Sequence, residues 1–148
     1  DLEVVLGKFT ASFLTMSFIV LLTLPYLALL FLWGSPEIAP IVASYAGLMA
    51  MIAVFSAIGV FASSMTENQI VSALVAFDLN LVFWMIGWTS MSQSGLLNEI
   101  LQYLSIIEHF EPMIKGIPKL TDVTYFTSLT VFFLYLTGQV LESKKWRG

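Results

Sequence analysis

The only histidine of the chain, His109, stands between two acids, Glu108 and Glu111. Imidazole and carboxylate groups are both metal ligands, so these three side chains could in principle hold a divalent cation. A metal site needs ligands that converge on one point, and closeness in sequence does not provide that. The pattern instead favours a solvated polar face of a helix. We therefore expect no metal here and no other cofactor in the chain.

Asp78 is the second candidate, because it interrupts an apolar stretch over residues 69–91 near its middle, with Asn80 beside it. An unpaired carboxylate in hydrocarbon costs about 2.5–3.5 kcal/mol, so Asp78 should face protein or water. Two interpretations stay open. Asp78 is a polar residue on a substrate path or proton relay, or it makes an interhelical hydrogen bond to a hydroxyl such as that of Ser56 or Ser72.

Enzymatic chemistry finds little support in the sequence. The absence of cysteine excludes disulfides, thiolate metal sites and cysteine nucleophiles. No Gly-x-x-x-x-Gly-Lys-Ser/Thr segment is present, so the chain has no phosphate-binding loop for a nucleotide. No serine has a plausible base and orienting acid, and an intramembrane hydrolase would need a second acid to pair with Asp78. We predict no catalytic residue.

The composition indicates an integral membrane protein. The 148 residues are 58% hydrophobic and only 11% charged, with a net charge of -4 and a mean hydropathy of +0.89. Soluble domains are typically about 45–50% apolar and about 25% charged. So little charge would not keep such an apolar particle in solution. No basic stripe is present to neutralise phosphates, which excludes a nucleic-acid partner.

Long uncharged intervals divide the chain into membrane spans. No charged residue occurs between Lys8 and Glu37, or between Glu37 and Glu67. A helix needs about 20 apolar residues to cross a bilayer. We predict an all-α polytopic fold, one transmembrane domain over residues 1–148, with helices at 9–33, 41–64, 69–91 and 123–141. The runs do not alternate in the way that barrel strands do.

Two irregular features are expected within this plan. Pro25 should kink the first span, and a static kink is favoured over a hinge. Residues 92–122 form a long connection in which apolar residues recur at helical spacing from Leu97 to Phe110. This predicts an amphipathic helix ended by Pro112, with its polar face including His109, in an outer helical segment at 96–120. It would lie at the membrane surface or dip into it.

The basic residues predict the orientation. Lys144, Lys145 and Arg147 follow the last span directly, so that end should be cytoplasmic. With four crossings the N-terminus lies on the same side. We expect a multi-pass protein of the plasma membrane with both ends in the cytoplasm and the 92–122 connection outside.

Several segments of the sequence resemble one transporter family. They are DLEVVLGKF at residues 1–9, TLPY at 23–26, FASSMTENQI at 61–70, SIIEHFE at 105–111 and LESKKWR at 141–147. In combination they are similar to the ABC-2-type transporter permeases, most closely to those associated with gliding motility and to related bacterial exporters.

The resemblance implies a bacterial inner-membrane permease with six membrane helices, of which this chain would hold the last four and lack two preceding ones. It also implies a second permease copy or paralogue as partner, and separate cytoplasmic ABC ATPase subunits that hydrolyse ATP. Carried over by position, ATPase coupling would fall to Glu3, Lys8, Glu67 and Gln69. The 92–122 connection would be an outer re-entrant hairpin, with Glu108, His109 and Glu111 on it. Such permeases are usually apolar where this chain has Asp78.

The leading expectation is thus the membrane-spanning subunit of an ATP-driven exporter, without enzymatic activity of its own. The alternative is a structural membrane subunit of a larger complex with no transport role.

Overall fold

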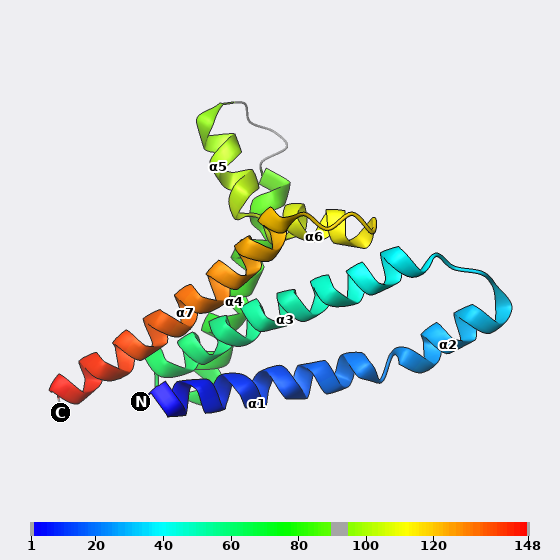
Figure 1. Ribbon diagram of the computed structural model, residues 1–148. Helices are drawn as coiled ribbons and strands as arrows, with labels where there is room; N and C mark the ends of the chain where they lie inside the picture. The colour runs from blue at the N-terminus through cyan, green and yellow to red at the C-terminus, as the bar shows by residue number, and fades with distance from the viewer. Residues whose placement is uncertain (1, 90–94, 148) are drawn as a thin grey trace.

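In the computed structural model of the chain, residues 2–89 and 95–147 are described. Within these ranges all regular structure is helical (Figure 1). The helices are α1 (Leu2–Leu21), α2 (Leu24–Trp33), α3 (Ile38–Met65), α4 (Gln69–Thr89), α5 (Leu96–Leu104), α6 (Ile106–Ile114) and α7 (Leu120–Arg147). Four segments are long and apolar enough to cross a membrane: Leu2–Trp33, Ile38–Met65, Gln69–Thr89 and Leu120–Arg147. The predicted all-α class with four such helices is confirmed.

The predicted helix ends were less accurate than the helices themselves. α1 begins at Leu2 rather than Phe9, and α7 runs over Leu120–Arg147 rather than 123–141. Hydropathy marks only the apolar part of a helix, whereas helical hydrogen bonding continues through good helix formers such as Glu and Lys. α4 is helical to Thr89, and the last two residues of the predicted span lie outside the described residues.

The expected kink near Pro25 is a full break between α1 and α2. Proline has no N–H to donate and its ring clashes with the carbonyl four residues earlier, so the first helix ends at Leu21. Pro25 then lies in the first turn of α2, where no donor is needed. The Thr23 hydroxyl donates to the Val20 carbonyl (2.6 Å) and lies 2.8 Å from the Tyr45 hydroxyl of α3. This contact holds the break against α3.

α3 is the central helix of the bundle and packs against α1, α4, α6 and α7. Val54, Ala57 and Ile58 of α3 are completely buried. Phe133 of α7 lies in edge and tilted contact with Phe83 of α4 and Phe61 of α3, with ring centres 5.9 and 5.6 Å apart. The core is therefore formed around one helix, and the outer helices leave many large apolar side chains exposed.

The two ends of the bundle differ (Figure 1). Both chain termini and the α3–α4 turn lie at one end, and the α2–α3 connection and the α5–α6 hairpin lie toward the other. We call the first the terminal end of the bundle and the second the hairpin end. α3 and α7 each contain 28 residues, so at a rise of about 1.5 Å per residue each spans about 42 Å between the ends.

Candidate functional site: the hairpin and its buried histidine

The outer segment is two helices, α5 and α6, and not the single amphipathic helix that the periodicity predicted. A pair of helices in this segment agrees with the helical hairpin that the resemblance implied. The chain breaks at Ser105, whose extended backbone separates α5 from α6. The Ser105 hydroxyl then accepts the Glu108 N–H (3.4 Å), which caps α6. Pro112 does not end the helix, which continues to Ile114. Gly116, at φ +80°, makes the left-handed turn that follows.

His109 is buried between α5 and α7, with only 8% of its surface exposed. Its Nδ1 lies 2.8 Å from Oδ1 of Asp122, and its Nε2 lies 2.7 Å from the carbonyl oxygen of Tyr103. Asp122 is 3% exposed, and its other oxygen accepts the Lys119 N–H (3.3 Å). The prediction of a solvated polar face was wrong for His109, because the hairpin turns this face toward the first turn of α7.

The hydrogen-bond partners determine how protons are shared by this pair. A carbonyl oxygen can only accept, so Nε2 of His109 must carry a proton toward Tyr103. Nδ1 then either donates to an ionised Asp122 or accepts from a protonated one. Both arrangements give the pair a net charge of zero, as burial of charge requires.

Two aromatic rings enclose the pair. Tyr125 of α7 stacks on the imidazole, with ring centres 3.9 Å apart and planes at 17°, and Tyr103 of α5 contacts it edge-on at 5.5 Å. The Tyr125 hydroxyl donates to the Leu104 carbonyl. Tyr103 and Leu104 are in the last turn of α5, whose carbonyls have no partner within that helix. We call His109, Asp122, Tyr103 and Tyr125 the hairpin clamp, since together they join α5, α6 and α7.

Three glycines lie where the hairpin packs closely against α3 and α4. A Cβ at Gly47 of α3 would lie 2.6 Å from the sulfur and 3.0 Å from the Cβ of Met113 in α6. A Cβ at Gly87 of α4 would lie 2.5 Å from the Ser105 hydroxyl, and one at Gly116 would lie 3.0 Å from the Pro40 nitrogen. Close approach of the hairpin to α3 and α4 thus depends on missing side chains.

The acids beside His109 do not converge with it. Glu111 is exposed and pairs with Lys115 (2.8 Å), whose hydrogen bond and charge hold the pKa of Glu111 below its usual value. Glu108 is only partly buried and its side chain is not part of the clamp. Among residues 2–89 and 95–147, no group of three or more His, Asp, Glu or Cys side chains could hold a metal.

The residues predicted to couple to an ATPase lie together at the terminal end. Glu3 and Lys8 are on the first turns of α1, and Glu67 and Gln69 are in or beside the α3–α4 turn (Figure 1). All four are exposed. Asn68 orders the turn, because its side-chain oxygen accepts the N–H of Ile70 (2.9 Å). They are therefore available to a partner, although their role stays a prediction.

Asp78 and Asn80 lie on α4 and do not meet a partner within the described part of the chain. Asp78 is exposed and makes no hydrogen bond there, so the proposed bond to Ser56 or Ser72 is absent. Asn80 is half-buried, and its side-chain oxygen is unpaired.

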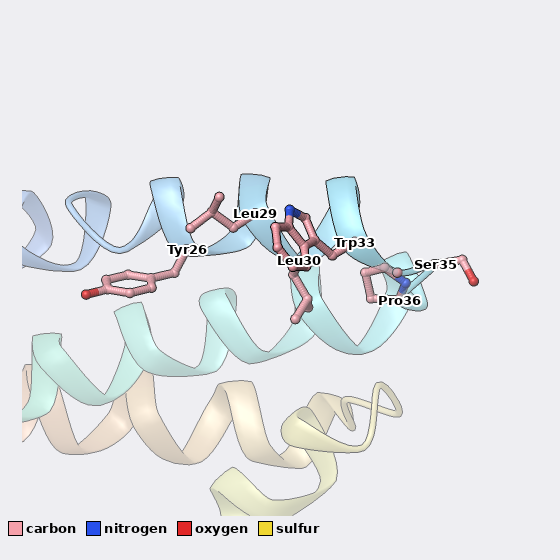
Figure 2. Close-up of a pocket in the computed structure, with 7 residues that line it drawn as sticks. Tyr26, Leu29, Leu30, Trp33, Ser35 and Pro36 are labelled. Atoms are coloured by element: carbon pink, nitrogen blue, oxygen red, sulfur yellow. The ribbon is translucent and has the colours of Figure 1, made fainter.

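The hollows of the described surface are mostly apolar. One of about 500 Å³ lies between α2 and the turn after it, where Leu30 points toward α3 and Trp33 lies beside Pro36 (Figure 2). A groove of about 900 Å³ lies between α1 and α7 at the terminal end. Leu2 of α1 and Trp146 of α7 are among the residues that line it. Neither holds a set of groups arranged for catalysis.

Comparison with models of protein families, with curated proteins and with solved structures finds no match for the chain.

Proposed function

We propose that the chain is a membrane-spanning permease subunit of an ATP-binding-cassette exporter, driven by a separate cytoplasmic ATPase. Its four long apolar helices would cross the membrane with both ends in the cytoplasm. The observation that carries the proposal is the separation of two features along the bundle: exposed polar residues at the terminal end and a clamped helical hairpin at the hairpin end.

Long helices provide the mechanical link between these ends. α3 contacts α6 of the hairpin and also packs along α1, α4 and α7. A subunit with no nucleotide site must receive work through contacts with its partner, and packed helices can pass a small tilt over such a distance. An ATPase bound at Glu67 and Gln69 would thus move the helix ends next to it, and α3 would transmit that motion to the hairpin.

The hairpin would cap the path on the outer side. Its clamp joins α5, α6 and α7 through buried and partly buried contacts, so the hairpin would move together with the start of α7. A cap of this kind opens or closes by rigid displacement instead of unfolding.

A structural subunit without a transport role is the second candidate. The observation that favours it is that the two grooves described above are lined mostly by apolar side chains. Such a subunit would need no ATPase at the terminal end.

Purification of the full protein from its native membranes separates these functions. We expect an ATPase to co-purify with the tagged protein, giving orthovanadate-sensitive ATP hydrolysis. The double variant Glu67→Ala, Gln69→Ala should lose most of this activity, because it removes the side chains of the α3–α4 turn. Glu99→Ala, an exposed acid at the hairpin end, is the matched control and should retain the ATPase. Wild-type protein without an associated ATPase would overturn the proposal in favour of the structural subunit.

A further inference from the structure

The groove between α1 and α7 at the terminal end is apolar along most of its length and polar at its mouth. Its volume of about 900 Å³ is at the upper end of the range of about 300–1,000 Å³ that is typical of ligand pockets. One wall is formed by Leu2, Val5 and Leu6 of α1, and the other by residues of α7 from Val131 to Trp146. We call it the α1–α7 groove.

The length of the groove matches one leaflet of a bilayer. From Val131 to Trp146 the lining advances by 15 residues along α7, which is about 22 Å at about 1.5 Å per residue. Val131 lies near the middle of the predicted span 123–141, and Trp146 lies beyond its end. One leaflet, with its headgroups, is about 20–22 Å thick. The groove therefore has the length of a single lipid molecule.

The mouth of the groove carries groups that suit a phosphate. Lys145 and Trp146 line it, and an ammonium group and an indole N–H can both donate hydrogen bonds to phosphate oxygens. Lys144 and Arg147 belong to the same last turn of α7 and are exposed. Glu142 is the acid among the lining residues. The three bases outnumber it, so the mouth has an excess of positive charge.

Gly138 keeps the middle of the groove open. A Cβ at this position would meet no atom within 4 Å, although α1 and α7 are in contact with each other. The described residues therefore leave this space unfilled. Water is a poor occupant, because a buried water needs two to four polar partners. Hydrocarbon chains fit the apolar walls better.

We propose that the α1–α7 groove binds one anionic phospholipid, with its acyl chains along the apolar walls and its phosphate at Lys145 and Trp146. Basic sites between membrane helices at the level of the headgroups favour anionic lipids. A zwitterionic lipid would gain less, since its own cationic group is repelled by the excess positive charge. A membrane helix of another chain would cross both leaflets, whereas the groove ends near the middle of the span. The inference rests only on the membrane-spanning part of the proposed function.

Native mass spectrometry of the full protein, stripped of lipid in detergent, measures the charge preference. The probes are phosphatidylglycerol and phosphatidylcholine with identical acyl chains. We expect the first phosphatidylglycerol to bind about fivefold more tightly or better, the effect of at least one Lys or Arg at the headgroup. The triple variant Lys144→Gln, Lys145→Gln, Arg147→Gln should reduce this preference below about twofold. Equal binding of both lipids by the wild type, or an unchanged preference in the triple variant, would overturn the anionic site.

The place of the lipid is tested by filling the groove. Gly138→Leu should weaken phosphatidylglycerol binding about tenfold or more, because the leucine takes space that the acyl chains need and meets no clash at its Cβ. Gly7→Leu is the matched control, since Gly7 of α1 is equally open but is not among the lining residues. It should keep the affinity within about twofold.

The same affinity in both leucine variants would overturn the groove as the site. Lower thermal stability of Gly138→Leu than of the wild type in lipid-free detergent would show that protein already fills the space, which would also overturn the lipid. Phosphatidylglycerol binding by a protein that recruits no ATPase would overturn only the proposed function. An ATPase-bound complex without a preference for phosphatidylglycerol would overturn only this inference.

Discussion

At the scale of single residues, the clamp depends on the fact that both ring nitrogens of His109 have a hydrogen-bond partner. This arrangement could not be read from the sequence, where His109 falls on the polar side of a helical projection. Asp122 marked only the boundary of the last span. The twelve residues between it and His109 include the turn at Gly116. The contact exists because that turn reverses the chain, and periodicity within one helix carries no information about such a reversal.

Removal of one member of the pair should therefore be strongly destabilising. We expect His109→Ala to lower the free energy of unfolding by about 3–5 kcal/mol, because Asp122 would be left buried without its main partner. Thermal unfolding in detergent, followed by circular dichroism, measures the effect. Glu99→Gln, an exposed substitution in α5, should change stability by about 0.5 kcal/mol or less. Equal stability of His109→Ala and wild type would contradict the clamp.

The exposed pair of Glu111 and Lys115 gives a prediction about pH. Lys115 lowers the pKa of Glu111, so this pair contributes stability above the usual carboxyl pKa and loses it as pH falls through the lowered value. Lys115→Met should return the Glu111 pKa toward its ordinary value, which carbon NMR of the carboxyl group can follow. The effect on overall stability should be small because both side chains are exposed. A Glu111 titration that is the same in both proteins would refute the interaction.

At the scale of elements, the four long helices were predictable from hydropathy, whereas the break between α5 and α6 was not. The charge-free intervals mark the spans because burying charge in lipid is costly. The break at Ser105 depends on its capping hydroxyl and on the close contact with Gly87, which are local and tertiary details. Pro112 is tolerated inside α6, so a proline in the sequence does not by itself mark a helix end.

Two glycines of α3 should respond to alanine in opposite directions. Gly47→Ala inserts a methyl group against Met113 and Phe110, and we expect a loss of about 1–3 kcal/mol from overpacking. Gly59→Ala meets no atom within 4 Å and should stabilise the helix by up to about 1 kcal/mol through helix propensity. Denaturation of both variants in the same detergent provides the comparison. A Gly47→Ala protein at least as stable as the wild type would show that the hairpin does not pack closely on Gly47.

At the scale of the whole molecule, the bundle is incomplete as a closed particle. Its centre is packed around α3, but the outward faces of α1, α2 and α4 expose large apolar side chains. These faces need lipid or further protein, as the composition predicted. What the composition could not predict is which face of α4 packs inward, because the choice between inward and outward faces requires the packed structure.

The arrangement of the ends predicts a labelling pattern in intact cells. Single cysteines at Glu3 and Ser143, at the terminal end, should react with an impermeant maleimide only after the membrane is opened. A cysteine at Lys119, next to the hairpin, should react from outside in intact cells. All three positions are exposed, so access differs only by side. Labelling of all three from one side would contradict the four-span arrangement.

The concentration of burial in α3 has a consequence for redesign. Within the apolar windows of the helices, 44% of the α3 residues are buried but only 6% of those in α4. The residues that form the internal packing and the residues suited to face lipid thus lie on largely separate helices. A water-soluble analogue should be obtainable by replacing outward side chains of α1, α2, α4 and α7 with polar ones, while the buried residues of α3 are left unchanged. That analogue would let the hairpin be studied in plain buffer.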